Sequence, residues 1–115
     1  MKIPRPTPAD IERFRSFVPQ DPRVEVKPMF GNLGAFVNGN MFMSLFGSDI
    51  GVKLAPADAA DLVAIERAGP FGPAERPMGG YVTVPPTLVG TPEGERWAAA
   101  ALVHVGAMPP QAAKK

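Results

Sequence analysis

A single dipeptide, Asn38-Gly39, separates two apolar runs of the chain, residues 35–37 and 40–43. A type I′ turn needs positive φ at both of its central residues, and Asn followed by Gly meets that need with little strain. The sequence therefore predicts a tight antiparallel hairpin with this dipeptide at its tip. A two-residue turn also fixes the register. The predicted cross-strand pairs are Val37 with Asn40, Phe36 with Met41, and Ala35 with Phe42.

Proline and glycine mark the boundaries of most other predicted elements. The chain has 115 residues with Pro 15 and Gly 12, just below the range that indicates low complexity. Prolines stand where helices begin or end, and glycines where turns are expected, with Gly69 expected to cap the second helix. Besides the hairpin, we expect an extended arm at 1–6, a helix at 8–18, a second helix that begins at 56 and a third from 92 to about 107. The expected strands are 23–27, 50–54 and 81–84, with a loop at 70–80 and a tail at 109–115.

This order of elements indicates an α+β fold in two layers. Four consecutive strands follow the first helix, and a fifth strand lies between the second and third helices. Helices segregated from a run of strands are typical of an antiparallel sheet with helices on one face. We therefore predict one domain over residues 1–115, with a sheet of about five strands.

The first predicted strand alternates charged and apolar residues. Arg23, Glu25 and Lys27 share one face, and the two valines between them share the other. Pro28 follows them and cannot donate a ladder hydrogen bond. The strand is therefore expected at a sheet edge, or to bulge at Pro28.

The central strands are apolar on both faces. Simple alternation places Met41, Met43 and Leu45 on one face, and Phe42 and Phe46 on the other. Helices in a two-layer fold cover only one face, so the other face needs a cover. That cover is a second copy, a bound peptide or ligand, or the loop at 70–80. We favour a homodimer, with Phe36, Met41 and Met43 facing the partner.

The residue types point away from catalysis. Cys 0 excludes a thiol nucleophile, a disulfide and a cysteine metal site, and His104 is the only histidine. We predict no catalytic residues, no metal and no cofactor. The chain has no secretory signal and no apolar span, so we expect a cytoplasmic protein without a membrane partner. With a net charge of +1, we expect any nucleic-acid binding to be weak, through a patch of Arg23 and Lys27 that Lys53 extends.

Two segments carry a family resemblance: Lys27-Pro28-Met29-Phe30-Gly31 and residues 34–42. Together with Val52-Lys53-Leu54 they resemble the N-terminal domain of the TfoX/Sxy family, over about residues 10–108. The resemblance implies a fold similar to secretion chaperones, which tend to dimerise. Two-domain members are linked to natural competence and carry a further helical domain. The motif residues, with a structural or interaction role, are Met29, Phe30, Gly31, Phe36, Asn38, Gly39, Met41 and Phe42.

Three functional hypotheses follow. The first is a non-enzymatic regulatory or protein-interaction module that acts as a homodimer. The second is a nucleic-acid-associated regulator of transcription or competence. The third is a small-molecule-binding protein with a pocket under the loop at 70–80.

Overall fold

The computed structural model describes residues 4–109, except residues 30, 66, 74 and 76. Within this part of the chain, one open antiparallel sheet has the strand order β1-β2-β3-β4-β6-β5. The α+β class predicted from the sequence is confirmed, and the sheet has one strand more than expected. The elements are α1 (Pro8–Phe17), β1 (Val24–Met29), β2 (Asn32–Val37), β3 (Asn40–Phe46), β4 (Asp49–Lys53), α2 (Pro56–Val63), β5 (Gly69–Pro70), β6 (Tyr81–Thr83), the 3₁₀ helix η1 (Pro86–Leu88) and α3 (Pro92–Gly106).

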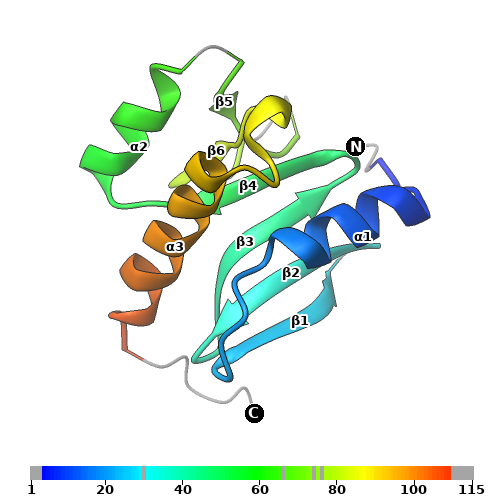
Figure 1. The fold of residues 1–115 in the computed structure, drawn as a ribbon, viewed down its shortest axis with the longest axis horizontal. Coiled ribbons are helices and arrows are strands. Elements are labelled where there is room, and N and C mark those ends of the chain that lie inside the picture. The colour runs from blue at the N-terminus through cyan, green and yellow to red at the C-terminus, as the bar shows by residue number, and fades with distance from the viewer. Residues whose placement is uncertain (1–3, 30, 66, 74, 76, 110–115) are drawn as a thin grey trace.

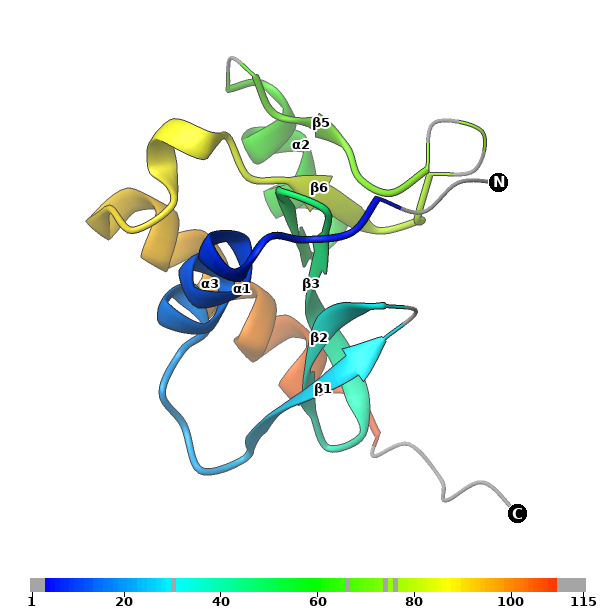
Figure 2. The same ribbon diagram turned by 90° about the vertical axis from the view of Figure 1, so that its right-hand side faces the viewer.

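Helices α1 and α3 cover the same face of the sheet (Figures 1 and 2). Both begin with a threonine cap followed by proline, as the sequence predicts. The Thr7 hydroxyl accepts from the backbone N–H of Asp10 at 3.1 Å, and the Asp10 carboxylate accepts from the N–H of Thr7 at 2.9 Å. This capping box satisfies donors that a helix start leaves without partners. No helix in the described residues is long and apolar enough to cross a membrane.

The end of α2 differs from the prediction. The helix ends at Val63 with Ala64 as its C-cap. Gly69 is not the cap: it lies in β5, opposite Thr83 of β6. Backbone bonding to β6 therefore decides the conformation of Gly69, and a helix-capping pattern read from local sequence does not include that distant partner.

The hairpin forms as predicted, but with one extra residue on β3. Asn38 and Gly39 have φ of 54° and 80°, as a type I′ turn requires. The pairs of Val37 with Asn40 and Phe36 with Met41 are confirmed. Ala35, however, faces Met43 and not Phe42, because the register shifts between Ala35 and Phe36. The extra residue makes a β-bulge on β3.

The bulge reassigns the two faces of β3. Phe42 and Met43 are both fully buried in the core under the helices. Met41 lies opposite Phe36, and Phe46 packs against Phe71, both on the other face. The predicted grouping of Met41 with Met43 is therefore wrong, because the bulge interrupts the alternation that the prediction assumed.

The core lies between the sheet and the helices. Its strand residues alternate with those of the opposite face, and its helix residues come mainly from one side of α1 and of α3, with Leu62 from α2. The large side chains fully buried in this core are Phe14, Val37, Phe42, Met43, Leu45, Ile50, Val52, Leu62, Val84 and Val105.

Candidate interaction surface

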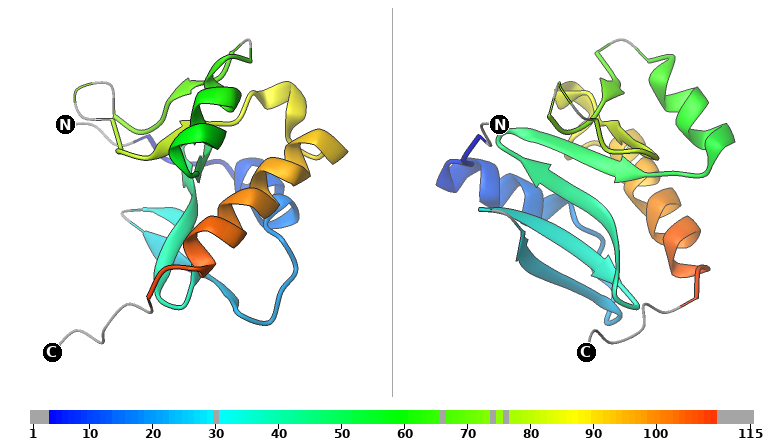
Figure 3. Two further views of the ribbon diagram at one scale, coloured as in Figure 1. Left: turned by 90° about the vertical axis from the view of Figure 1, so that its left-hand side faces the viewer. Right: turned by 180° about the vertical axis from the view of Figure 1, so that it is seen from behind.

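One face of the sheet carries no helix, as the view from behind shows (Figure 3, right). We call it the helix-free face and define it by four half-buried side chains from three strands. They differ from ordinary surface residues because all are large and apolar or aromatic. The four are Phe36 of β2, Met41 and Phe46 of β3, and Tyr81 of β6.

A row of small residues crosses the middle of this face. Gly34, Ser44 and Gly51 lie opposite one another on β2, β3 and β4. A Cβ added at Gly34 would lie 2.7 Å from Sδ of Met41 and 3.0 Å from a ring carbon of Phe36. The two large side chains therefore lie over Gly34, and a side chain at position 34 would displace them.

The segment after β5 covers the other end of the row. The ring of Phe71 fills the space that a side chain at Gly51 would need. It packs with its centroid 6.2 Å from that of Phe46 and 6.0 Å from that of Tyr81, and is only 1% exposed. The chain itself therefore covers the β4–β6 part of the helix-free face. Phe36 and Met41, over β2 and β3, lie outside this cover.

Two lysines border the helix-free face. The ammonium of Lys27 lies 4.7 Å from the ring centroid of Phe36 and 3.9 Å from a carboxylate oxygen of Glu25. The ammonium of Lys53 lies 6.0 Å from the ring of Tyr81. These distances are those of cation–π contacts. The face therefore presents apolar surface with positive charge at its border.

Tyr81 ties two distant strands together. Its hydroxyl donates a hydrogen bond of 2.9 Å to the carbonyl of Met41. Burial raises the pKa of the Tyr81 hydroxyl well above its ordinary value, so the group stays a neutral donor. This bond fixes the backbone beside the β-bulge, where Met41 turns toward the helix-free face.

The Met29-Phe30-Gly31 motif lies at the turn between β1 and β2. Met29 is the half-buried last residue of β1, and Phe30 lies outside the described residues. Gly31 has φ of 81°, and a Cβ there would meet nothing within 4 Å. Glycine is therefore favoured at this position by backbone conformation rather than by packing. A turn-forming role accounts for what the structure shows of this motif.

The remaining motif residues fall into two groups. Asn38 and Gly39 form the exposed hairpin tip, where the Asn38 side chain donates to the carbonyl of Gly106 at 3.5 Å. Phe42 and Met43 are both 0% exposed. Met43 is therefore inaccessible to a partner in the folded chain. Of the three residues expected to face a partner, Phe36 and Met41 are half-exposed on the helix-free face, and their role stays a prediction.

The sequence reasoning missed the contribution of Phe71. This residue stands between Pro70 and Gly72, a context typical of a loop, and nothing local predicts a contact with Gly51. The only available signal was the glycine within a strand, which often marks the close approach of another group. The loop at 70–80 is one of the covers that the sequence allows for the sheet, and the structure places Phe71 in that role.

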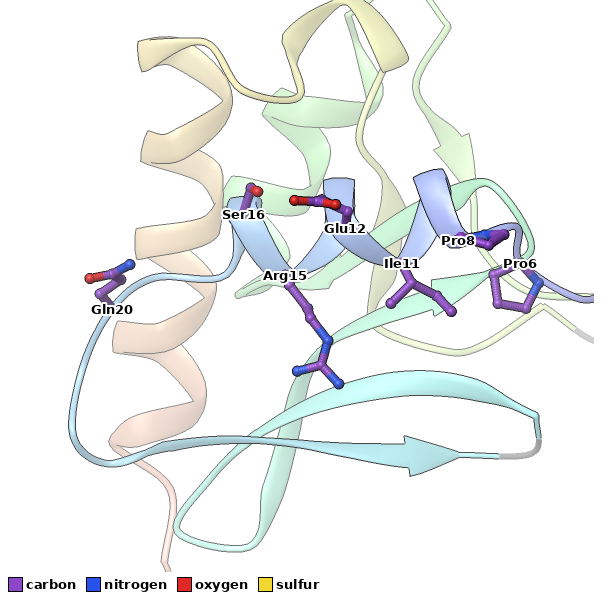
Figure 4. A pocket seen from close by; sticks show the side chains of 7 residues that line it. All are labelled: Pro6, Pro8, Ile11, Glu12, Arg15, Ser16 and Gln20. Atoms are coloured by element: carbon purple, nitrogen blue, oxygen red, sulfur yellow. The ribbon is translucent and has the colours of Figure 1, made fainter.

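Two shallow hollows lie elsewhere on the surface. One is lined by Ala55, the residue before α2, and by alanines of α3, with Asp58, Arg96 and His104. The other follows the exposed side of α1, where Ile11 and Arg15 point toward the side on which β1 and β2 lie (Figure 4). Among the described residues, no group of three His, Cys, Asp or Glu side chains is placed to hold a metal ion.

The chain matches a known protein family. The model of the family described as the TfoX N-terminal domain matches residues 15–105. This range includes the hairpin, the β-bulge and the whole helix-free face. No curated protein and no solved structure matches the chain significantly.

Proposed function

Because the chain belongs to the TfoX N-terminal domain family, we propose that it is a non-enzymatic regulatory or protein-interaction module that acts as a homodimer. Family membership supports the regulatory part, since two-domain members of this family are linked to the control of competence. The proposal gives the helix-free face the role of a contact surface rather than of a catalytic cleft.

One observation carries the protein-interaction part of this proposal. Phe36 and Met41 are half-exposed side by side on the helix-free face, beyond the segment that Phe71 covers. Large apolar side chains grouped on a surface favour a protein contact. Methionine suits such a contact because its unbranched, polarisable side chain adapts to different partners.

Sedimentation velocity over a dilution series tests the homodimer. At tens of micromolar we expect a species of twice the 12.2 kDa mass of the chain, which dissociates on dilution. A strict monomer at these concentrations would contradict the homodimer.

Nucleic-acid binding is a second candidate, favoured by the two lysines beside aromatic rings. Lys27 lies against Phe36, and Lys53 lies near Tyr81. Lysines can contact phosphates, and aromatic rings can stack on the bases of a single strand. Binding would be weak and salt-dependent. Lack of retention on single-stranded or duplex DNA in about 50 mM salt would reject this candidate.

A small-molecule pocket under the loop at 70–80 has less support. Phe71 occupies the space over Gly51, between Phe46 and Tyr81, where such a ligand would lie. The two interaction hypotheses therefore take precedence over it.

A further inference from the structure

The outer edge of β1 is the long open edge of the sheet. At the opposite end, β5 has only two residues, Gly69–Pro70. β1 has six residues, and within the described part of the chain no strand pairs with its outer side. An edge strand presents unpaired N–H and C=O groups that can accept another strand.

The hairpin shows which groups of β1 point outward. Val37 flanks the two-residue turn, so its N–H and C=O bond to β3. Because successive residues of a strand direct their backbone groups to opposite sides, the N–H and C=O of Phe36 point to β1. Glu25, opposite Phe36, therefore points inward, and its neighbour Val26 points outward. The N–H of Val24 agrees with this alternation, since it bonds to Asp21 at 2.9 Å and not to β2.

Pro28 fits the same alternation. Like Val24 and Val26, it is a residue whose backbone groups point away from β2, so its missing N–H removes no bond to β2. It also limits the edge, because only Val26 offers both a free N–H and an outward C=O. A second strand would therefore be held at the centre of β1 and not along its whole length.

The charges of β1 are complementary to themselves. Glu25 and Lys27 flank Val26 on the helix-free side, with side chains 71% and 47% exposed. In an antiparallel pair of β1 strands with Val26 opposite Val26, each Glu25 faces the Lys27 of the other strand. A shift of two residues in either direction would place Glu25 opposite Glu25, or Lys27 opposite Lys27. Opposite charges favour a cross-strand pair and like charges disfavour it, so one register is selected.

The other side of the same edge is apolar. Val24 and Val26 are half-buried against the core, together with Ile11 of α1. In the centred register, the valines of the second strand would continue this apolar surface. The edge therefore combines ionic pairing on the helix-free side with apolar contact on the helix side.

We propose that two copies of this chain join through antiparallel β1 strands, with Val26 opposite Val26 and two Glu25–Lys27 pairs between the copies. This inference rests on the proposed homodimer and names its interface. A two-fold axis perpendicular to the sheet keeps both helix-free faces on the same side. Phe36 and Met41 of both copies then stay open to a further protein.

Charge reversal at the edge tests this interface. Glu25→Lys and Lys27→Glu each place like charges opposite each other twice in the dimer, and each should raise the dimer dissociation constant about tenfold. A mixture of the two variants should associate again, because every cross-strand pair in the mixed dimer is then of opposite charge. The double variant Glu25→Lys/Lys27→Glu should also dimerise.

Lys53→Glu is the matched control, since it reverses a charge on the same face but on β4. It should leave the dissociation constant unchanged. All variants are first compared with the unmodified chain by circular dichroism. Weaker dimerisation of each single variant, together with recovered dimerisation in their mixture, supports the interface. A dimer insensitive to both reversals overturns the β1 interface but keeps the homodimer, whereas a monomeric unmodified chain overturns both.

Discussion

The ring of Phe71 lies directly over Gly51, in the space that a side chain at position 51 would occupy. Phe71 comes from the segment that follows β5, whereas Gly51 lies in the middle of β4. This contact closes part of the helix-free face, and it separates the covered region from the region that contains Phe36 and Met41.

Gly51→Ala should destabilise the fold by roughly 1–3 kcal/mol, because the added methyl group displaces the Phe71 ring from a close-packed site. Denaturant unfolding measures this cost. Gly79→Ala is the control, since a Cβ there meets nothing within 4 Å. In a chain that carries Phe71→Ala, the cost of Gly51→Ala should largely disappear. Equal costs in both backgrounds would show that Phe71 does not hold this place.

The β-bulge predicts different costs for two neighbouring methionines. Met43→Ala removes a side chain that is 0% exposed in the core and should cost about 2–5 kcal/mol. Met41→Ala removes a half-exposed side chain and should cost clearly less. Chemical denaturation of both variants gives the comparison. Equal costs at the two positions would mean that Met41 and Met43 share one face of the sheet, as simple alternation without the bulge requires.

Stability should fall in acid partly through Asp10. Hydrogen bonding from the Thr7 backbone, and then from its side chain, lowers the pKa of Asp10 below its ordinary value of 3.8. A carboxyl with a lowered pKa in the folded state stabilises the fold above the pKa of the unfolded chain. That contribution is lost as the pH falls through the folded pKa.

Asp10→Asn should therefore lower the unfolding midpoint at neutral pH, and the difference from the unmodified chain should narrow below about pH 4. Thermal unfolding of Asp10→Asn and of the unmodified chain at several pH values gives the two midpoints to compare. A constant difference across this pH range would exclude a role for the Asp10 charge in capping α1.

Local chemistry made much of the fold predictable. Thr7 and Thr91 signal helix starts, and Asn38-Gly39 signals a hairpin, because each acts on backbone groups within a few residues. For the same reason Pro28 limited the first strand to a sheet edge or a bulge, because its missing N–H cannot bond to a neighbouring strand, and the structure places β1 at the edge.

Features that depend on distant contacts were not predictable from local patterns. The β-bulge places both Phe42 and Met43 under the helices, and packing in the assembled core decides that arrangement. Gly69 bonds to β6 and Phe71 packs on Gly51, and each partner is more than ten residues away. The candidate surface was therefore only partly predicted: Phe36 and Met41 lie on it, whereas Met43 does not.

Disulfide cross-linking at Val26 tests the β1 dimer most directly, because the chain has Cys 0 and one introduced cysteine gives a clean result. In the proposed register, the two Val26 Cα atoms lie about 5.5 Å apart, within the range that a disulfide spans. Val26→Cys should therefore form a covalent dimer rapidly under mild oxidation, whereas Val63→Cys, on the exposed side of α2, should not. Cross-linking of Val26→Cys no faster than that of Val63→Cys would contradict the account.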